Sequence, residues 1–154
     1  MRRIDKIIVH CTATPGGREV TVDQVTQWHR ARGFRTIGYH YLVYLDGSVH
    51  AGRPVAEVGA HCLGQNAHSV GVCYVGGIDR DTLRPKDTRT AAQRESLRRL
   101  VTELMRRFPG ATLHGHREFA AKACPCFDVS TLATSCRADA AAARAGSRST
   151  GGAE

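Results

Sequence analysis

Two short apolar segments constrain the fold of this chain more than any other feature. Residues 4–10 contain the run Ile7-Ile8-Val9, and residues 70–75 form a second apolar run that ends at Gly76. Segments of this length with apolar residues at consecutive positions are typical of strands buried on both faces of a sheet. We therefore expect both segments to lie in the interior of a sheet that is covered on each side.

Three further segments complete the predicted sheet. Residues 39–45 are rich in Tyr, Leu and Val, which favour strands. Asp46-Gly47 is a strong signal for a two-residue hairpin turn, so residues 48–51 are expected to form the return strand. Residues 111–114 follow Pro109-Gly110 and are predicted to form the last strand.

Helix-start signals occur three times. Thr21 and Thr90 each stand three residues before a glutamine, which is capping-box spacing, and predict helices over residues 21–32 and 90–108. The second helix has apolar residues at three- and four-residue steps, namely Leu97, Leu100, Val101, Leu104, Met105 and Phe108. Asp128 is expected to cap a short last helix over residues 129–136.

The mixture of strands and helices predicts an α/β protein, a single domain with a central mixed β-sheet flanked by helices. The length of 154 residues fits one domain. We expect residues 1–137 to form that domain. Residues 138–154 are rich in Ala, Arg, Ser and Gly without periodicity, which predicts a flexible C-terminal tail.

The formal net charge of +8 favours an anionic partner. The arginines along the second predicted helix are more typical of a solvated helical face than of a nucleic-acid site; they are Arg94, Arg98, Arg99, Arg106 and Arg107. No nucleic-acid-binding signature is present in the sequence, so no nucleic acid is expected to bind. Apolar runs are too short for a membrane span, and residues 1–6 lack the apolar core of a signal peptide. We therefore expect synthesis in the cytoplasm and no membrane insertion.

The six cysteines are expected to be free thiols, because a chain of this size without an export signal is not typical of disulfide-rich secreted proteins. Cys11 and Cys73 lie in strand-like runs and are predicted to be small core residues. Cys126 and Cys136 could pair under oxidising conditions, although nothing in the sequence requires it.

The segment from Gly115 to Pro125 concentrates chemically active side chains, with an imidazole at His116, an ammonium group at Lys122 and a thiol at Cys124. Far upstream, His10 ends the first apolar run. Two His and one Cys form a known ligand set for a catalytic zinc ion, in which the fourth position stays open. Spacing alone leaves His114 and Cys126 as rivals, because His114 and His116 would share one face of a strand.

A cysteine nucleophile paired with a histidine is the competing chemistry. Local signatures of the large cysteine-protease families are absent. Pro125 also follows Cys124 directly, so the thiol is not at a helix N-terminus of the kind that activates a nucleophile. Metal ligation therefore explains Cys124 better.

An ordered series of motifs runs through about residues 4–136. It comprises His10-Cys11-Thr12-Ala13-Thr14, Trp28-His29, Gly38-Tyr39-His40-Tyr41, Asp46-Gly47, Gly52-Arg53, Gly59-Ala60-His61, Gly64-Gln65-Asn66, Ser69-Val70-Gly71-Val72, Val75-Gly76-Gly77, His116-Arg117-Glu118 and Lys122-Ala123-Cys124-Pro125. In order and spacing the series resembles the N-acetylmuramoyl-L-alanine amidases of the phage T7 lysozyme type. The wider group includes the peptidoglycan recognition proteins.

The resemblance implies a role for particular residues. It implies that His10, His116 and Cys124 bind one Zn²⁺ per chain, which would make residues 1–137 a zinc amidase catalytic domain. It implies that Tyr39 and Lys122 are catalytic. It also gives His61 and Asn66 as weaker candidates for contact with the substrate.

The implied reaction is zinc-dependent hydrolysis of the amide bond between N-acetylmuramic acid and L-alanine in peptidoglycan. A protein without a signal peptide fits a phage or prophage endolysin, which waits in the cytoplasm as a monomer and acts on the cell wall after release. The alternative is a non-catalytic peptidoglycan-binding or regulatory module of the same fold. A complete ligand set together with Tyr39 and Lys122 argues against that alternative.

Overall fold

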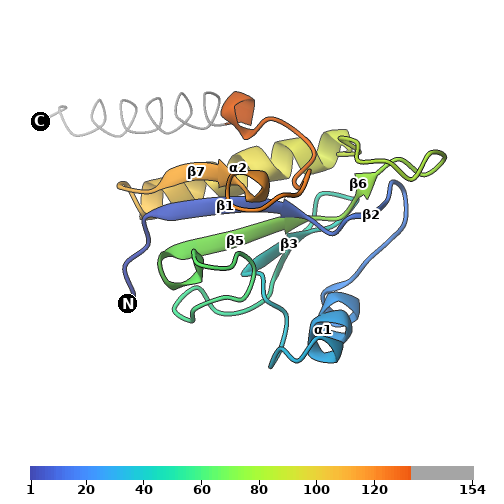
Figure 1. Ribbon diagram of the computed structural model, residues 1–154. Coiled ribbons are helices and arrows are strands. Elements are labelled where there is room, and N and C mark those ends of the chain that lie inside the picture. The colour runs from blue at the N-terminus through green and yellow to red at the C-terminus, as the bar shows by residue number, and fades with distance from the viewer. Residues whose placement is uncertain (133–154) are drawn as a thin grey trace, which may run out of the picture.

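The computed structural model describes residues 1–132, and the predicted tail over 138–154 lies outside them. The expected α/β fold with a central mixed sheet is confirmed (Figure 1). The five-stranded sheet has the order β4-β3-β5-β1-β7, and only the β3–β4 hairpin is antiparallel. Its strands are β1 (Lys6–Cys11), β3 (Tyr41–Val43), β4 (Val49–Ala51), β5 (Ser69–Tyr74) and β7 (Thr112–Gly115).

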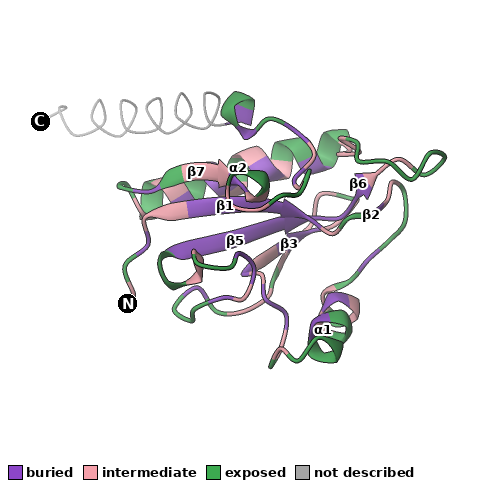
Figure 2. Cartoon of the chain, viewed as in Figure 1, coloured by how far each residue is buried: buried purple, intermediate pink, exposed green. Residues whose placement is uncertain are grey.

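The two apolar segments that dominate the sequence pair with each other inside the sheet. Strand β1 runs parallel to β5, with Lys6 opposite Ser69 and Cys11 opposite Tyr74, and its other edge pairs with β7. Both strands are buried almost throughout, as Figure 2 shows. Consecutive apolar residues are therefore explained by a covering layer on each face of the sheet.

Each face of the sheet has its own core. Helix α2 (Ala91–Arg107) covers one face, where Val9, Tyr74 and Leu97 belong to one apolar cluster. Helix α1 (Val22–Ala31) lies toward the opposite face, where Val25 and Cys73 belong to a second cluster. Because side chains alternate along a strand, His10 points away from the α2 face on which Val9 lies. The His10 side chain therefore lies on the α1 side of the sheet.

The helix-start predictions are confirmed at the atomic level. The Thr90 hydroxyl accepts the Gln93 N–H at 3.0 Å, and the Gln93 side chain accepts the Thr90 N–H at 2.9 Å. Gln93 is fully buried, and its Nε2 donates to the carbonyl of Val75 at 2.9 Å, which ties α2 to the end of β5. Thr21 caps α1 by accepting the Gln24 N–H at 3.2 Å.

Some short elements differ from expectation. The strand predicted over 39–45 is reduced to β3. The hairpin is present, but its expected two-residue turn is wrong: Val43 pairs with Val49 and the Tyr44 N–H donates to the Ser48 carbonyl, so the loop has three residues, 45–47. The segments expected to be loops contain a two-stranded sheet of β2 (Thr14–Pro15) and β6 (Gly77–Ile78), and two 3-10 turns, η1 (Asn66–His68) and η2 (His116–Glu118). Two- and three-residue elements are too short to show a hydrophobic period.

The last predicted helix begins where expected. The Asp128 carboxylate accepts the Ser130 N–H at 2.9 Å, and residues 129–132 are helical up to the end of the described chain. Between residues 1 and 132, no helix has the length and apolar character needed to cross a membrane.

Candidate active site

A cleft of about 710 Å³ opens on the α1 side of the sheet, at the carboxyl ends of β1 and β7. Open α/β sheets commonly bind ligands at the carboxyl ends of their strands. The lining includes Cys11, Thr12, His29, Arg32, Phe34, Tyr39, His61, Cys62, Leu63, Asn66, His116, Phe119, Lys122 and Cys124. Residues from both ends of the described chain therefore meet in one cavity.

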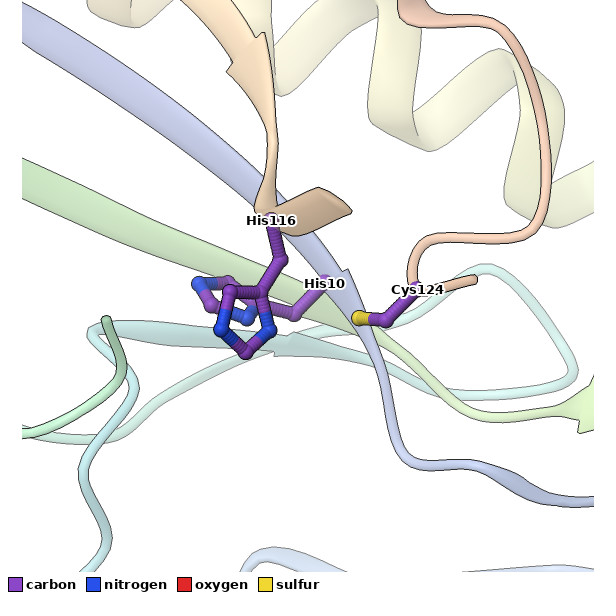
Figure 3. A group of neighbouring side chains, drawn as sticks. All are labelled: His10, His116 and Cys124. Atoms are coloured by element: carbon purple, nitrogen blue, oxygen red, sulfur yellow. The ribbon is translucent and has the colours of Figure 1, made fainter. Parts of the chain in front are cut away.

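Three possible metal ligands converge at this cleft. His10 is at the end of β1, His116 opens η2 directly after β7, and Cys124 lies in the loop that follows. One ligand atom from each lies within 4.8 Å of the others, and Figure 3 shows the two imidazoles and the thiol grouped together. Two imidazole nitrogens and a sulfur at this spacing fit a tetrahedral zinc ion with one open position.

His114, the rival of His116, is directed elsewhere. The two histidines do not share a strand face, because β7 ends at Gly115 and the chain turns into η2 at His116, just past the strand as expected. The His114 ring instead contacts the Thr112 hydroxyl at 2.6 Å and a carboxylate oxygen of Glu118 at 2.9 Å. Glu118 also accepts the Gly115 N–H at 2.6 Å, so its carboxylate stabilises the turn that separates the two histidines.

Cys126, the rival of Cys124, also lies outside the ligand group. Its sulfur is 3.9 Å from the sulfur of Cys11, and the group of converging ligand atoms includes that of Cys124 but not that of Cys126. All five described cysteines are free thiols, and Cys136 lies outside the described residues.

Specific backbone contacts hold Cys124 in place. The Cys11 N–H donates to the Cys124 sulfur at 3.2 Å, and the Arg117 N–H donates to the Cys124 carbonyl at 2.7 Å. One residue further on, the buried Tyr74 hydroxyl donates to the carbonyl of Pro125 at 2.6 Å. These contacts hold the Cys124 sulfur within reach of the His10 and His116 imidazoles.

The electrostatic environment keeps the histidines neutral. Burial holds the pKa of His10 well below its usual value, and the neighbouring His61, His116 and Lys122 lower it further. Burial, and then the Lys122 charge, also lowers the pKa of His116. A neutral imidazole has the lone pair that a metal requires, so both residues are in the form suited to ligation.

Lys122 and Tyr39 line the same cleft. Lys122 is exposed at the cleft wall, and its charge lowers the pKa of both His10 and His116. The Tyr39 ring centroid is 5.1 Å from that of His10. Burial, followed by the nearby thiol of Cys73, raises the pKa of Tyr39 well above its usual value, so its hydroxyl stays protonated and can donate a hydrogen bond.

His61 and Asn66 also line the cleft, but much of their hydrogen-bonding capacity is used within the protein. His61 Nδ1 lies 2.8 Å from His10 Nε2, and its Nε2 lies 3.2 Å from the Ser69 hydroxyl. The Asn66 side-chain oxygen accepts the N–H groups of His61 and Cys62, both at 2.9 Å. The amide nitrogen of Asn66 is the donor left for a ligand.

The helix side of the cleft contains residues to which the sequence motifs assigned no role. His29 on α1 is buried, its Nδ1 accepts the Gly38 N–H at 2.8 Å, and burial lowers its pKa to about 4. Arg32 and Phe34 line the same wall. The sequence indicates only that His29 lies on the apolar face of a helix. That position does not distinguish a residue that lines a cleft from a residue of the core.

Known proteins are similar to this chain over the same part that forms the fold and the cleft. The family model described as N-acetylmuramoyl-L-alanine amidase matches residues 1–127. The endolysin of Escherichia phage T7 is 46% identical over 125 residues, which cover 81% of this chain and 82% of that protein.

Two solved structures have similar folds. An endolysin from a bacteriophage of Thermus scotoductus has a TM-score of 0.72 and 27% identity, covering 88% of this chain and 86% of its own. The N-acetylmuramoyl-L-alanine amidase LysC from Clostridium intestinale has a TM-score of 0.72 and 26% identity, covering 85% and 83%.

Proposed function

Because the chain belongs to the N-acetylmuramoyl-L-alanine amidase family, we propose that the cleft is its active site, with His10, His116 and Cys124 as ligands of one Zn²⁺. The protein is a cell-wall amidase of the endolysin type. The reaction is hydrolysis of the amide bond that joins N-acetylmuramic acid to L-alanine. The convergence of three metal-ligand atoms within 4.8 Å carries the proposal.

The donor set suits zinc, because neutral imidazoles and a thiolate are its preferred ligands. When bound at an open site, zinc lowers the pKa of water to about 7 and polarises a carbonyl group. The other requirements of the reaction must be met by side chains of the protein. They must keep three ligands deprotonated, orient the scissile amide and stabilise the negative charge that develops on its oxygen.

Lys122 is the residue proposed to stabilise that charge. It is a flexible cation at the cleft wall, close enough to the ligand histidines to lower their pKa values. Tyr39 is proposed to donate a hydrogen bond to the attacking water or to the carbonyl oxygen, because its hydroxyl remains protonated at neutral pH. Donors directed at a developing oxyanion are among the largest single contributions to catalysis.

Peptidoglycan is the proposed substrate, and its anionic character matches the net charge of +8. We propose that Asn66 contacts the substrate through its side-chain nitrogen, and that His61 contacts it through the part of the ring that faces the cleft. The protein is proposed to act as a monomer on the cell wall after release from the cytoplasm.

The alternative, a peptidoglycan-binding module without catalysis, predicts a different outcome in one experiment. Purified protein is incubated with peptidoglycan, with and without a chelator, and newly exposed L-alanine amino groups are quantified. We expect release without the chelator, loss of release with it, and recovery when zinc is restored. Binding to peptidoglycan without release, or release that is insensitive to metal removal, contradicts the proposed zinc amidase.

A further inference from the structure

His61 has a setting that contact with a substrate does not explain. It is 8% exposed, and both ring nitrogens have partners inside the protein. Nδ1 lies 2.8 Å from His10 Nε2, while Nε2 lies 3.2 Å from the hydroxyl of Ser69, which is fully buried in β5. The three side chains form a continuous hydrogen-bonded chain that leads from β5 to the end of β1.

The space for the His61 ring is provided by two glycines. A Cβ atom at Gly71 would come within 2.6 Å of the ring, and one at Gly59 would come within 2.8 Å. Real Cβ atoms do not approach other atoms so closely, so any larger residue would displace the ring. The backbone of His61 is held separately, because Asn66 accepts its N–H at 2.9 Å.

The direction of the hydrogen bond between the two rings determines whether His10 can bind a metal. A neutral imidazole has one N–H and one bare nitrogen. If His10 Nε2 donates to His61 Nδ1, then His10 Nδ1 is bare and available to a metal, and His61 Nε2 donates to Ser69. If the bond runs the other way, His10 Nδ1 carries the proton and no nitrogen of His10 is free for ligation.

We propose that His61 and Ser69 are positioning residues, which hold His10 in the tautomer and orientation needed to bind the metal through Nδ1. This inference rests on the zinc site proposed above. Hydrogen-bonded partners of metal-binding histidines commonly fix the tautomer in this way, and their loss typically weakens metal affinity about 10–100-fold. His61 then acts on the reaction through His10, in addition to forming part of the cleft wall.

Zinc affinity of the metal-free protein, measured by competition with a chromogenic chelator, tests the proposal without using activity. We expect His61→Leu to bind zinc about 10–100-fold more weakly than the wild type. His61→Asn should recover part of the loss, because its side-chain oxygen can replace Nδ1 as acceptor. Ser69→Ala should show a smaller loss in the same direction. His68→Leu, the same exchange at an exposed residue of η1, is the matched control and should match the wild type.

The outcomes separate the two proposals. If the wild type binds one zinc ion and folded His61→Leu binds it equally tightly, the positioning role is overturned while the zinc site stands. If the wild type binds no zinc, the zinc site itself is overturned. Should His61→Leu not fold, ¹⁵N NMR of the imidazoles in the zinc-loaded wild type decides. A protonated Nε2 and a metal-bound Nδ1 on His10 support the proposal, and the reverse pattern overturns it.

Discussion

The two halves of the candidate site are built in different ways. His10 lies on β1, which is paired on both edges, and its side chain is 1% exposed. Cys124 and Lys122 lie in an irregular segment that is half-buried or exposed. The position of His10 is fixed by the backbone hydrogen bonds that pair β1 with β5 and β7. The loop half depends on a few individual contacts, so single substitutions there should have sharper and more separable effects.

The largest effect is expected at the loop ligand. Cys124→Ala removes the only thiol of the ligand group, and we expect loss of bound zinc and of detectable amidase turnover. Cys126→Ala is the matched control two residues away, and it should keep both. Metal content by elemental analysis, together with release of L-alanine amino groups, measures the pair. Equal zinc retention in both variants would show that the ligand assignment is wrong.

The next largest effect is expected at the loop cation. Lys122→Ala removes a proposed donor to the developing oxyanion, which typically lowers kcat on the order of a hundredfold or more. Zinc content should not fall, because the ammonium group is not a ligand. Steady-state kinetics on soluble muropeptides checks kcat, and metal analysis checks the site. Turnover at the wild-type rate would remove Lys122 from the mechanism.

A moderate effect is expected where the loop is attached to the core. Tyr74→Phe deletes the hydrogen bond to the Pro125 carbonyl, which should lower the free energy of unfolding by about 1–3 kcal/mol and weaken zinc binding as Cys124 loosens. Tyr44→Phe is the control, because its hydroxyl accepts the Val22 N–H at 2.8 Å away from the ligand group. It should lose similar stability in urea denaturation without a change in zinc affinity. Equal zinc affinity in both variants would show that Tyr74 does not support the loop half.

The smallest effect concerns the buried histidines of the strand and helix side. The pKa of His29 is lowered to about 4 and that of His61 to about 3, mainly by burial. Between those values and an unfolded pKa of about 6.5, the unfolded chain binds more protons than the folded one. The metal-free protein should therefore lose stability as the pH falls from about 6.5 toward 4.

Urea denaturation at a series of pH values measures this slope. His29→Asn keeps an acceptor for the Gly38 N–H but removes one titrating group, so it should flatten the slope. A wild-type stability that does not change between pH 6.5 and 4 would contradict the neutral state of these histidines in the fold.

Much of this architecture could be predicted from local patterns. The apolar runs of β1 and β5, the Asp46-Gly47 turn and the Thr90–Gln93 capping box each act over a few neighbouring residues, so the sequence displays them directly. The short β2–β6 sheet and the turn η2 have no such local pattern. Because η2 was not anticipated, spacing alone could not separate His116 from His114.

The sequence by itself determined the kinds of side chain available, the strands and helices that present them, and the ordered motifs that place the chain in its family. Tertiary structure decided which of those side chains meet. Burial between two layers keeps His10 neutral, the end of β7 directs His116 away from His114, and the Cys11 N–H aims at Cys124 rather than Cys126. The reason is physical: the contacts that join His10 to His116 and Cys11 to Cys124 span a few ångströms between residues about a hundred positions apart, and the short turn at His116 has no local pattern that specifies it.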